Sequence, residues 1–334
     1  MDIVDYLTRV TSTRAIPGIS LATLRGGKPD IACYAGVRGA HDPLPVDAQT
    51  VFEAASLTKP VVAFIALQLV DEGRLDLHRP MADIGGEYVP DDPRARDITA
   101  FHILTHTSGL PNIVRAEAPL RTYFPPGERF SYGSSAFAWL QRALESVGGA
   151  PLEVLAQTRV FGPLGMHRSS LLWQARFEDN HAQGHEWEGE PVPKRRLMSA
   201  QASWSMLTTA SDYLAFVQAV LAGEGLSAAT RAAWFLPRMN GRQGGEAEDL
   251  YAANPIDPAV AWGLGWGIEI AQQCCFHWGN SPGFRALVLA NRETKDAVVW
   301  FANGARGLRV AHEVVPQAVS GHHPCIPWLG IGRL

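Results

Sequence analysis

The spacing of apolar residues divides the chain into a strand-rich beginning, a helical middle and a strand-rich end. Residues 14–25 and 30–38 have the apolar and β-branched content of two strands, and the Gly-Gly-Lys-Pro turn between them predicts a hairpin. The last third of the chain predicts a final helix near 307–319 before a Pro-rich tail. Ahead of that helix, turn residues separate four strand patterns at 263–271, 274–279, 284–291 and 296–303.

The middle of the chain favours helices. Residues 56–73 are apolar on nearly all sides and end at a glycine, which is typical of a buried central helix. Residues 209–223 predict an amphipathic helix capped by Thr209 or Ser211. Between these two, Pro and Gly clusters break the chain into short helical patterns near 99–106, 134–147 and 151–161.

Strands at both ends around a helical middle indicate an α+β fold. We expect an antiparallel sheet flanked by helices, with both termini packed on it and a helical subdomain inserted. The expected α/β subdomain comprises 1–75 plus 201–334, and the mainly helical subdomain comprises 76–200. Together they would form one domain.

Composition excludes several classes of protein. A chain of 334 residues that is 46% hydrophobic and 19% charged is neither disordered, collagen-like nor a disulfide scaffold. A net charge of −4 gives no electrostatic reason to expect nucleic acid or an anionic membrane as partner. The longest apolar stretch, 61–70, is too short to span a bilayer.

The N-terminus and the cysteines suggest a cytoplasmic location. Acidic Asp2 and Asp5 stand where a signal peptide would need a basic start and an apolar run. The four cysteines have no C-x-x-C spacing, so reduced thiols are expected. They are Cys33, Cys274, Cys275 and Cys325.

The strongest chemical signal is Ser56-Leu57-Thr58-Lys59 at the start of the predicted central helix. Side chains three residues apart lie on one helix face, so Lys59 can act as the base that takes the Ser56 proton. The helix N-terminus also offers backbone N–H groups to a developing oxyanion. The alternative is an N-capping serine followed by a solvated lysine, which the apolar helix after Pro60 makes less favourable.

The chain resembles the serine β-lactamase and penicillin-binding-protein-like superfamily, in the branch of class C β-lactamases, D-Ala-D-Ala carboxypeptidases and family VIII carboxylesterases. The similar segments occur in the family's order from about 50 to 305. They are FEAASLTK at 52–59, EGRLDL at 72–77, ILTHTSGLP at 103–111, PGERFSY at 126–132, FGPLGM at 161–166, TTASD at 208–212, GLGWG at 263–267 and HWG at 277–279.

The resemblance implies Tyr132 as the second catalytic group, which would deprotonate Ser56 and later protonate the leaving group. Without the resemblance, Tyr132 would be read as a half-buried aromatic residue. Two residues on, the family usually carries an Asn that contacts the amide of a β-lactam or peptide, whereas this chain has Ser134. That departure weakens the expectation of β-lactam or peptidoglycan substrates.

The resemblance also implies a pocket-lining strand at His277-Trp278-Gly279, and an oxyanion hole made by the backbone N–H groups of Ser56 and Asn280. His277 would either contact a substrate anion or transfer protons, or it is a strand histidine bonded to neighbouring backbone. Trp278 in place of a small residue favours esters and hydrophobic acyl groups.

Further residues lie near the family's pocket segments. Arg285 would bind a carboxylate or be a solvated arginine at a strand end, and Trp204 and Trp262 fall near the pocket. The resemblance also suggests that His185 replaces an aromatic residue near the pocket.

Other histidines and a cysteine do not indicate a metal. His102 and His106 have the spacing of a helical metal pair but lack a third ligand, so zinc is not expected there. His322, His323 and Cys325 are expected to be tail residues.

The expected function is that of a cytoplasmic serine hydrolase that forms an acyl-enzyme on Ser56 without metal or cofactor. A carboxylesterase acting on small or hydrophobic acyl esters is favoured over a β-lactamase. D-amino-acid amidase, carboxypeptidase-like or acyltransferase chemistry is the first alternative. A non-catalytic binding protein on the same fold is the second. The oligomeric state is left open.

Overall fold

The computed structural model describes residues 2–13, 16–245 and 247–332. Within them, nine strands form one antiparallel sheet in the order β3-β2-β1-β11-β10-β9-β8-β7-β6. These strands are β1 Gly18–Arg25, β2 Lys28–Gly39, β3 Asp42–Pro45, β6 Met239–Arg242, β7 Ile256–Trp262, β8 Gly267–Glu269, β9 Cys274–Ser281, β10 Phe284–Asn291 and β11 Ala297–Ala302. A separate two-stranded ribbon pairs β4 Phe52–Glu53 with β5 Leu207–Thr208.

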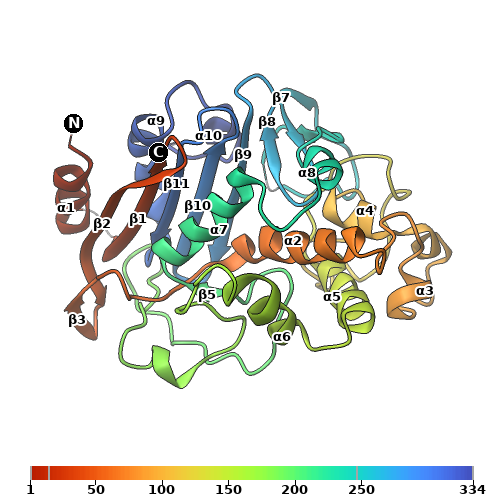
Figure 1. Cartoon of the computed structure of the whole chain (residues 1–334), viewed down its shortest axis with the longest axis horizontal. Coiled ribbons are helices and arrows are strands. Elements are labelled where there is room, and N and C mark those ends of the chain that lie inside the picture. Colours follow the sequence, from red (N-terminus) through yellow and green to blue (C-terminus); the bar gives the residue numbers. More distant parts are fainter. Residues whose placement is uncertain (1, 14–15, 246, 333–334) are drawn as a thin grey trace.

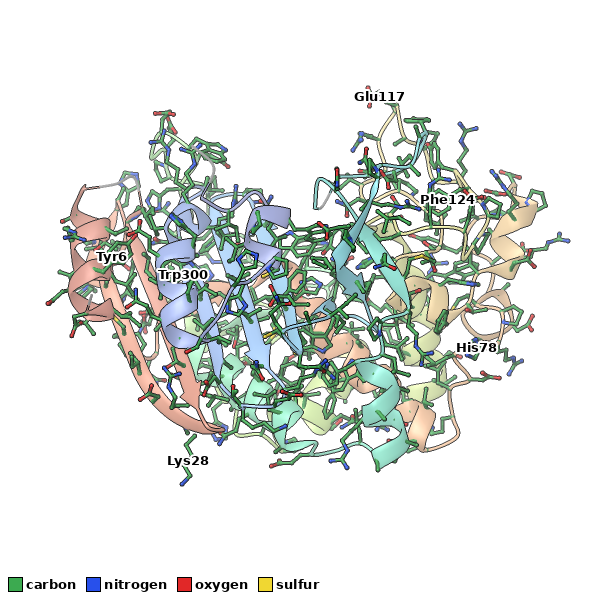
Figure 2. The ribbon with its side chains drawn as sticks, turned by 90° about the horizontal axis from the view of Figure 1, so that it is seen from above. Tyr6, Lys28, His78, Glu117, Phe124 and Trp300 are labelled. Atoms are coloured by element: carbon green, nitrogen blue, oxygen red, sulfur yellow. The ribbon has the colours of Figure 1, made fainter. Side chains whose placement is uncertain are left out.

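Helices cover both faces of the sheet, and α2 runs between the sheet and the helices α5 and α6 (Figure 1). The helices are α1 Ile3–Thr13, α2 Thr58–Asp71, α3 Ala82–Gly85, α4 Ala100–Leu104, α5 Ser135–Gly148, α6 Leu152–Ala156, α7 Ala210–Ala222, α8 Ala228–Trp234, α9 Ala311–Ala318 and α10 Cys325–Trp328. Figure 2 shows Tyr6 and Trp300 towards one end of the molecule and His78 and Phe124 towards the other.

The alternation of side chains along each strand builds two separate cores. On β11, Val299 and Phe301 face the core formed with α2, α5 and α7, whereas Val298 and Trp300 face the core formed with α1, α9 and α10. This explains why the central strands are apolar on both faces. The pairing of β1 with β11 joins the two ends of the chain in one sheet, which confirms the expected α+β fold.

The strands and helices follow the sequence expectations with local differences. The hairpin, the helix over 209–223 with its Thr209 cap, and the strands over 284–291 and 296–303 are confirmed. Arg14 and Ala15, at the start of the expected hairpin, lie outside the described residues. The helix expected over 151–161 begins as α6 and continues as a wider π-turn at Gln157–Phe161.

The prediction of a strand over 263–271 is wrong for the first half of that range. Only Gly267–Glu269 pair in the sheet, because the chain turns at Gly263–Trp266 with Gly265 at φ +87°, a conformation that favours glycine. Strands β6 and β7 and helices α1 and α8 were not expected. The division at 75/76 and 200/201 stays a prediction.

Asn303 joins three strands at the end of the sheet where β1 begins and β11 ends. Its buried carboxamide accepts a hydrogen bond from Gly18 N at 2.6 Å and donates to the carbonyls of Val37 and Arg38. One side chain therefore satisfies buried backbone groups on β1 and β2 from a position just after β11.

We expect Asn303→Ala to lower the free energy of unfolding by about 2–4 kcal/mol, because several buried backbone groups lose their partner. Urea denaturation followed by circular dichroism measures this. The control is Asn240→Ala on the edge strand β6, whose amide makes one long contact to Asp257 O at 3.4 Å. A loss as small as that of the control would show that water replaces Asn303.

Candidate active site

A cavity of about 740 Å³ opens at the N-terminal end of α2. Five of the residues predicted for the site lie in its wall together with Ser56. They are Tyr132, Ser134, Trp204, Asn280 and Arg285. The structure therefore gathers, from four distant parts of the sequence, most of the side chains that the motifs singled out.

Ser56 lies in a tight 3₁₀ turn, Ala55–Leu57, between β4 and α2. Ala55 has φ +48°, which is costly for a residue with a Cβ and is sustained here by its surroundings. The Thr58 hydroxyl donates to Ala55 O at 2.7 Å and accepts from Met206 N at 3.0 Å. These bonds hold the turn so that Ser56 is partly exposed to the cavity while its neighbours are buried.

Lys59 is fully buried, and its ammonium contacts Ser56 directly. Its Nζ lies 2.9 Å from Ser56 Oγ and 3.0 Å from the carbonyl oxygen of Ser203. The ammonium also lies 4.9 Å from the centre of the Tyr132 ring. A buried lysine needs such partners, since an unpaired charge in the protein interior is strongly unfavourable. The alternative of a solvated lysine is wrong.

Tyr132 lies in a loop before α5 and is 2% exposed, with its ring packed against other rings. The ring centres of His106 and Trp278 lie 4.4 and 4.7 Å from that of Tyr132. Ser131 N donates to His106 O, and Gly133 N donates to His106 Nδ1 at 3.1 Å. His106 thus holds the backbone on both sides of Tyr132 in place.

Two buried histidines flank Tyr132 and Lys59, and both are neutral. Burial and then the charge of Lys59 lower the pKa of His277 to about 3, and the same causes lower the pKa of His106 well below its usual range. His277 Nδ1 lies 2.9 Å from the backbone of Trp278, as expected of a strand histidine bonded to neighbouring backbone. His277 is not among the residues that line the Ser56 cavity.

Two of the expected pocket tryptophans do not line the Ser56 cavity. Trp262 is buried among rings, 6.1 Å from Tyr132 between ring centres. Trp278 packs on Tyr132 and borders a second cavity of about 230 Å³, which shares Asn280 and Arg285 with the first. Trp278 is therefore not among the residues that line the Ser56 cavity, contrary to expectation, because its ring is stacked beside that of His277, 5.3 Å between ring centres, in the aromatic layer behind Tyr132.

Gly279 brings β9 against the nucleophile turn. A Cβ at this position would lie 2.3 Å from Ala54 O, closer than real atoms approach. A side chain here would push apart the Ser56 turn and the strand that carries Asn280. Gly279 is thus a packing requirement of the site rather than a group that contacts substrate.

Arg285 lies beside the cavity but is engaged with backbone. Its Nη1 donates to the carbonyls of Ser281 and Phe284 at 3.0 and 2.7 Å. Opposite it, Ser134 precedes α5, and its hydroxyl makes no capping bond to that helix. Asn280 is exposed on β9, directly paired with Arg285 on β10.

The remaining histidines have structural contacts. His102 caps α4 with Thr99, while His106 follows the end of that helix at φ +54°, so their spacing does not create a metal pair. His185 is buried between Asn303 O and Ala40 N, and it does not itself line the Ser56 cavity, although its neighbour Glu186 does. Of the expected tail residues, His322 is exposed, whereas His323 and Cys325 are buried.

Several groups at the site were not foreseen from the sequence. Ser203 acts through its carbonyl, which no residue type reveals. The others that line the cavity carry no motif of their own. They include Tyr88, Asn112, Ile113, Val114, Glu186 and Gln201.

The sheet, the central helix and the Ser56–Lys59 contact at its N-terminus define a protein of the β-lactamase/transpeptidase-like fold. The chain belongs to the β-lactamase family, whose model matches residues 4–319. It is 29% identical over 296 residues to penicillin-binding protein 4 of Amycolatopsis lactamdurans, covering 80% of this chain and 74% of that protein.

Two further similarities bear on this family. Esterase EstB of Burkholderia gladioli is 32% identical over 187 residues, covering 45% of this chain and 46% of the esterase. A class C β-lactamase structure superposes with a TM-score of 0.75 at 21% identity, covering 96% of each chain, which shows the shared fold. In the part of the chain that the structure describes, no helix has the length and apolarity to cross a membrane.

We expect Gly279→Ala to leave the protein folded but to slow the reaction of Ser56 with a fluorophosphonate by about 10²–10³-fold, since the strand carrying Asn280 must move away. Gel fluorescence against time measures the rate. In the control Gly241→Ala on β6, the new Cβ meets its nearest atoms at 3.3 Å, and labelling should stay at the native rate. Native-rate labelling of Gly279→Ala would show that the close approach is dispensable.

Proposed function

We propose that this protein is a serine hydrolase that forms an acyl-enzyme on Ser56. The observation that carries the proposal is the 2.9 Å contact between Lys59 Nζ and Ser56 Oγ in the wall of a cavity large enough for a small substrate. A serine hydroxyl is a weak nucleophile until a neighbouring base accepts its proton.

In the proposed mechanism, Ser56 Oγ attacks the substrate carbonyl while the Tyr132 phenolate, stabilised by the neighbouring Lys59 ammonium, takes up its proton. Backbone N–H groups of Ser56 and Asn280 stabilise the oxyanion, and the collapsing intermediate expels the leaving group, which receives a proton from Tyr132. Water then attacks the acyl group and returns Ser56 to its free form. Neutral His106 and His277 add no positive charge to compete with Lys59.

The favoured substrate is a small carboxylic ester. Apolar side chains of Ile113, Val114 and Trp204 line one part of the cavity and suit an acyl chain. Ser134 stands where the family usually presents an amide-binding Asn, and Arg285 is already occupied by two carbonyls. Both features reduce the recognition of a peptide-like amide and its carboxylate.

Asn112 supports amides as the second candidate class of substrate. Asn112 lines the same cavity, and its Oδ1 atom is buried and has no hydrogen-bond partner among the described residues. Such an acceptor suits the N–H of an acylamino group, which an ester with a simple acyl chain lacks. D-amino-acid amides and peptide-like substrates are therefore the alternative, followed by acyl transfer to an alcohol.

Fluorophosphonate labelling tests the nucleophile. We expect native protein to be labelled at Ser56, and Lys59→Met and Tyr132→Phe to react about 10²–10⁴-fold more slowly, because Tyr132→Phe removes the proton acceptor and Lys59→Met removes the charge that stabilises its phenolate. Lys28→Met, on the exposed hairpin turn, should match the native rate. Folded protein that stays unlabelled at Ser56, or an unaffected Lys59→Met, would instead support a binding protein without catalysis.

A substrate panel separates esters from amides and β-lactams. We expect kcat/KM for p-nitrophenyl esters to exceed that for a chromogenic cephalosporin and for D-amino-acid amides by at least about tenfold. Asn112→Leu should leave simple esters unaffected and further weaken the amides. Rapid turnover of the cephalosporin with no detectable hydrolysis of the esters would refute the ester preference. Ser56 would remain the nucleophile.

A further inference from the structure

A second group of reactive side chains lies outside the Ser56 cavity, where the C-terminal segment meets the sheet. Glu269 at the end of β8 pairs directly with Cys274 at the start of β9. His323 comes from the segment between α9 and α10, and Cys325 is the first residue of α10. Both thiols and the carboxylate are fully buried, and His323 is 4% exposed.

The polar groups of this cluster meet at the Glu269 carboxylate. Its Oε2 lies 2.9 Å from His323 Nδ1, and its Oε1 accepts from the backbone N–H of Cys325 at 2.9 Å. Burial and then the Glu269 charge raise the pKa of the Cys274 and Cys325 thiols, and Cys274 Sγ donates to the carbonyl oxygen of Gln272 at 3.4 Å. The ligand atoms of Glu269, Cys274 and His323 all lie within 4.8 Å of one another.

The orientation of His323 requires a proton or a metal cation between its Nδ1 atom and the Glu269 carboxylate. His323 Nε2 lies 2.8 Å from the carbonyl oxygen of Val319, so Nε2 carries a hydrogen. In a neutral imidazole, Nδ1 is then an acceptor, as is the carboxylate oxygen 2.9 Å away. Two facing acceptors need a proton or a cation between them. A backbone carbonyl that orients the far nitrogen is also the usual outer partner of a metal-bound histidine.

We propose that Glu269, Cys274 and His323, whose ligand atoms already lie within 4.8 Å of one another, bind a structural zinc ion, and that the Cys325 thiol moves in as the fourth ligand. Two sulfurs, one imidazole nitrogen and one carboxylate oxygen are a donor set that zinc takes in four-coordinate tetrahedral sites. Four protein ligands leave no open position, and the cluster is sealed from solvent, so the ion would stabilise structure rather than activate water. On binding, the two thiols release their protons to solvent and His323 binds as the neutral imidazole.

The bound ion would hold the C-terminal segment that carries His323 and Cys325 against the sheet. His323 and Cys325 immediately precede Trp328, whose ring packs on Phe276 and Trp278 with ring centres 5.8 and 5.7 Å apart. Trp278 in turn packs on Tyr132. Zinc would therefore stabilise the aromatic layer behind the active site without contacting the Ser56 cavity.

A proton is the competing occupant. Burial alone would lower the pKa of His323, but its hydrogen bonds to Glu269 and Val319 and the Glu269 charge together raise it. A protonated His323 would then form a buried ion pair with Glu269. The ion pair needs neither thiol, whereas zinc needs both, so the cysteines distinguish the two states.

The adjacent cysteines of β9 supply a matched control. Cys275 follows Cys274 but faces the other core, where it packs with residues that contact α2 and α7. Both cysteines are buried and both are free of disulfides. Replacing either by Ala removes one buried sulfur, and only the Cys274 sulfur belongs to the proposed site.

The experiment measures zinc by elemental mass spectrometry in the full chain, purified without a metal-affinity step from zinc-supplemented cells. We expect about one zinc per native chain and per Cys275→Ala chain, and a loss of at least tenfold in Cys274→Ala and Glu269→Gln. Chelation of the native protein should lower its Tm, and added zinc should restore it. Cobalt added to the chelated protein should give the charge-transfer absorption of thiolate-bound cobalt.

The outcomes are decisive even where a variant does not fold, because the cobalt spectrum uses the native chain. A folded native protein that carries no zinc, shows no thiolate–cobalt absorption and keeps its Tm after chelation would establish the ion pair and overturn the proposal. Zinc that persists in Cys274→Ala would also overturn it, since the ion would then lie elsewhere.

Discussion

The burial of one ammonium group constrains the active site more than any other feature. Lys59 is fully buried, and its charge is met by the Ser56 hydroxyl and the Ser203 carbonyl. A buried charge is tolerated only with well-placed partners, so the nucleophile turn and the segment around Ser203 must keep fixed positions relative to α2. The hydrogen bonds of Thr58 to Ala55 and Met206 hold them in these positions.

The sheet places the rest of the site around this charge. Because β9 meets the nucleophile turn at Gly279, Asn280 lies in the wall of the cavity that Ser56 faces. On the other side, His106 fixes the loop that presents Tyr132. Behind both lies a layer of aromatic rings that continues to Trp328 and the C-terminal segment. The cavity and the chain terminus are therefore parts of one packed unit.

Much of the fold followed from the sequence, because the central strands and α2 are strongly apolar. Strands at both ends of the chain predicted an antiparallel sheet with both ends packed on it, but not the particular pairing of β1 with β11. Elements at the periphery were missed: β7 contains Pro258, and α1 shows its apolar stripe only at Ile3, Tyr6, Leu7 and Val10. The turn at Gly263–Trp266 was taken for strand because its Leu and Trp residues are apolar.

The candidate site was predictable where the chemistry belongs to side chains in motifs. Ser56, Lys59 and Tyr132 meet in the structure, whereas the Ser203 carbonyl has no signature in the sequence. Trp278 was misplaced because its ring packs into the aromatic layer behind Tyr132, which its position in the motif does not reveal. Cys274, His323 and Cys325 were noted in the sequence, but their meeting with Glu269 was not foreseen, because β10, β11 and α9 lie between Cys274 and His323.

The most direct test of the central proposal is a crystal structure of the protein after reaction with a phosphonate. The account predicts phosphorus bonded to Ser56 Oγ and a phosphoryl oxygen about 2.7–3.1 Å from the backbone nitrogens of Ser56 and Asn280. Lys59 should still contact the Ser203 carbonyl. An unmodified Ser56, or a phosphoryl oxygen directed away from both nitrogens into solvent, would contradict it.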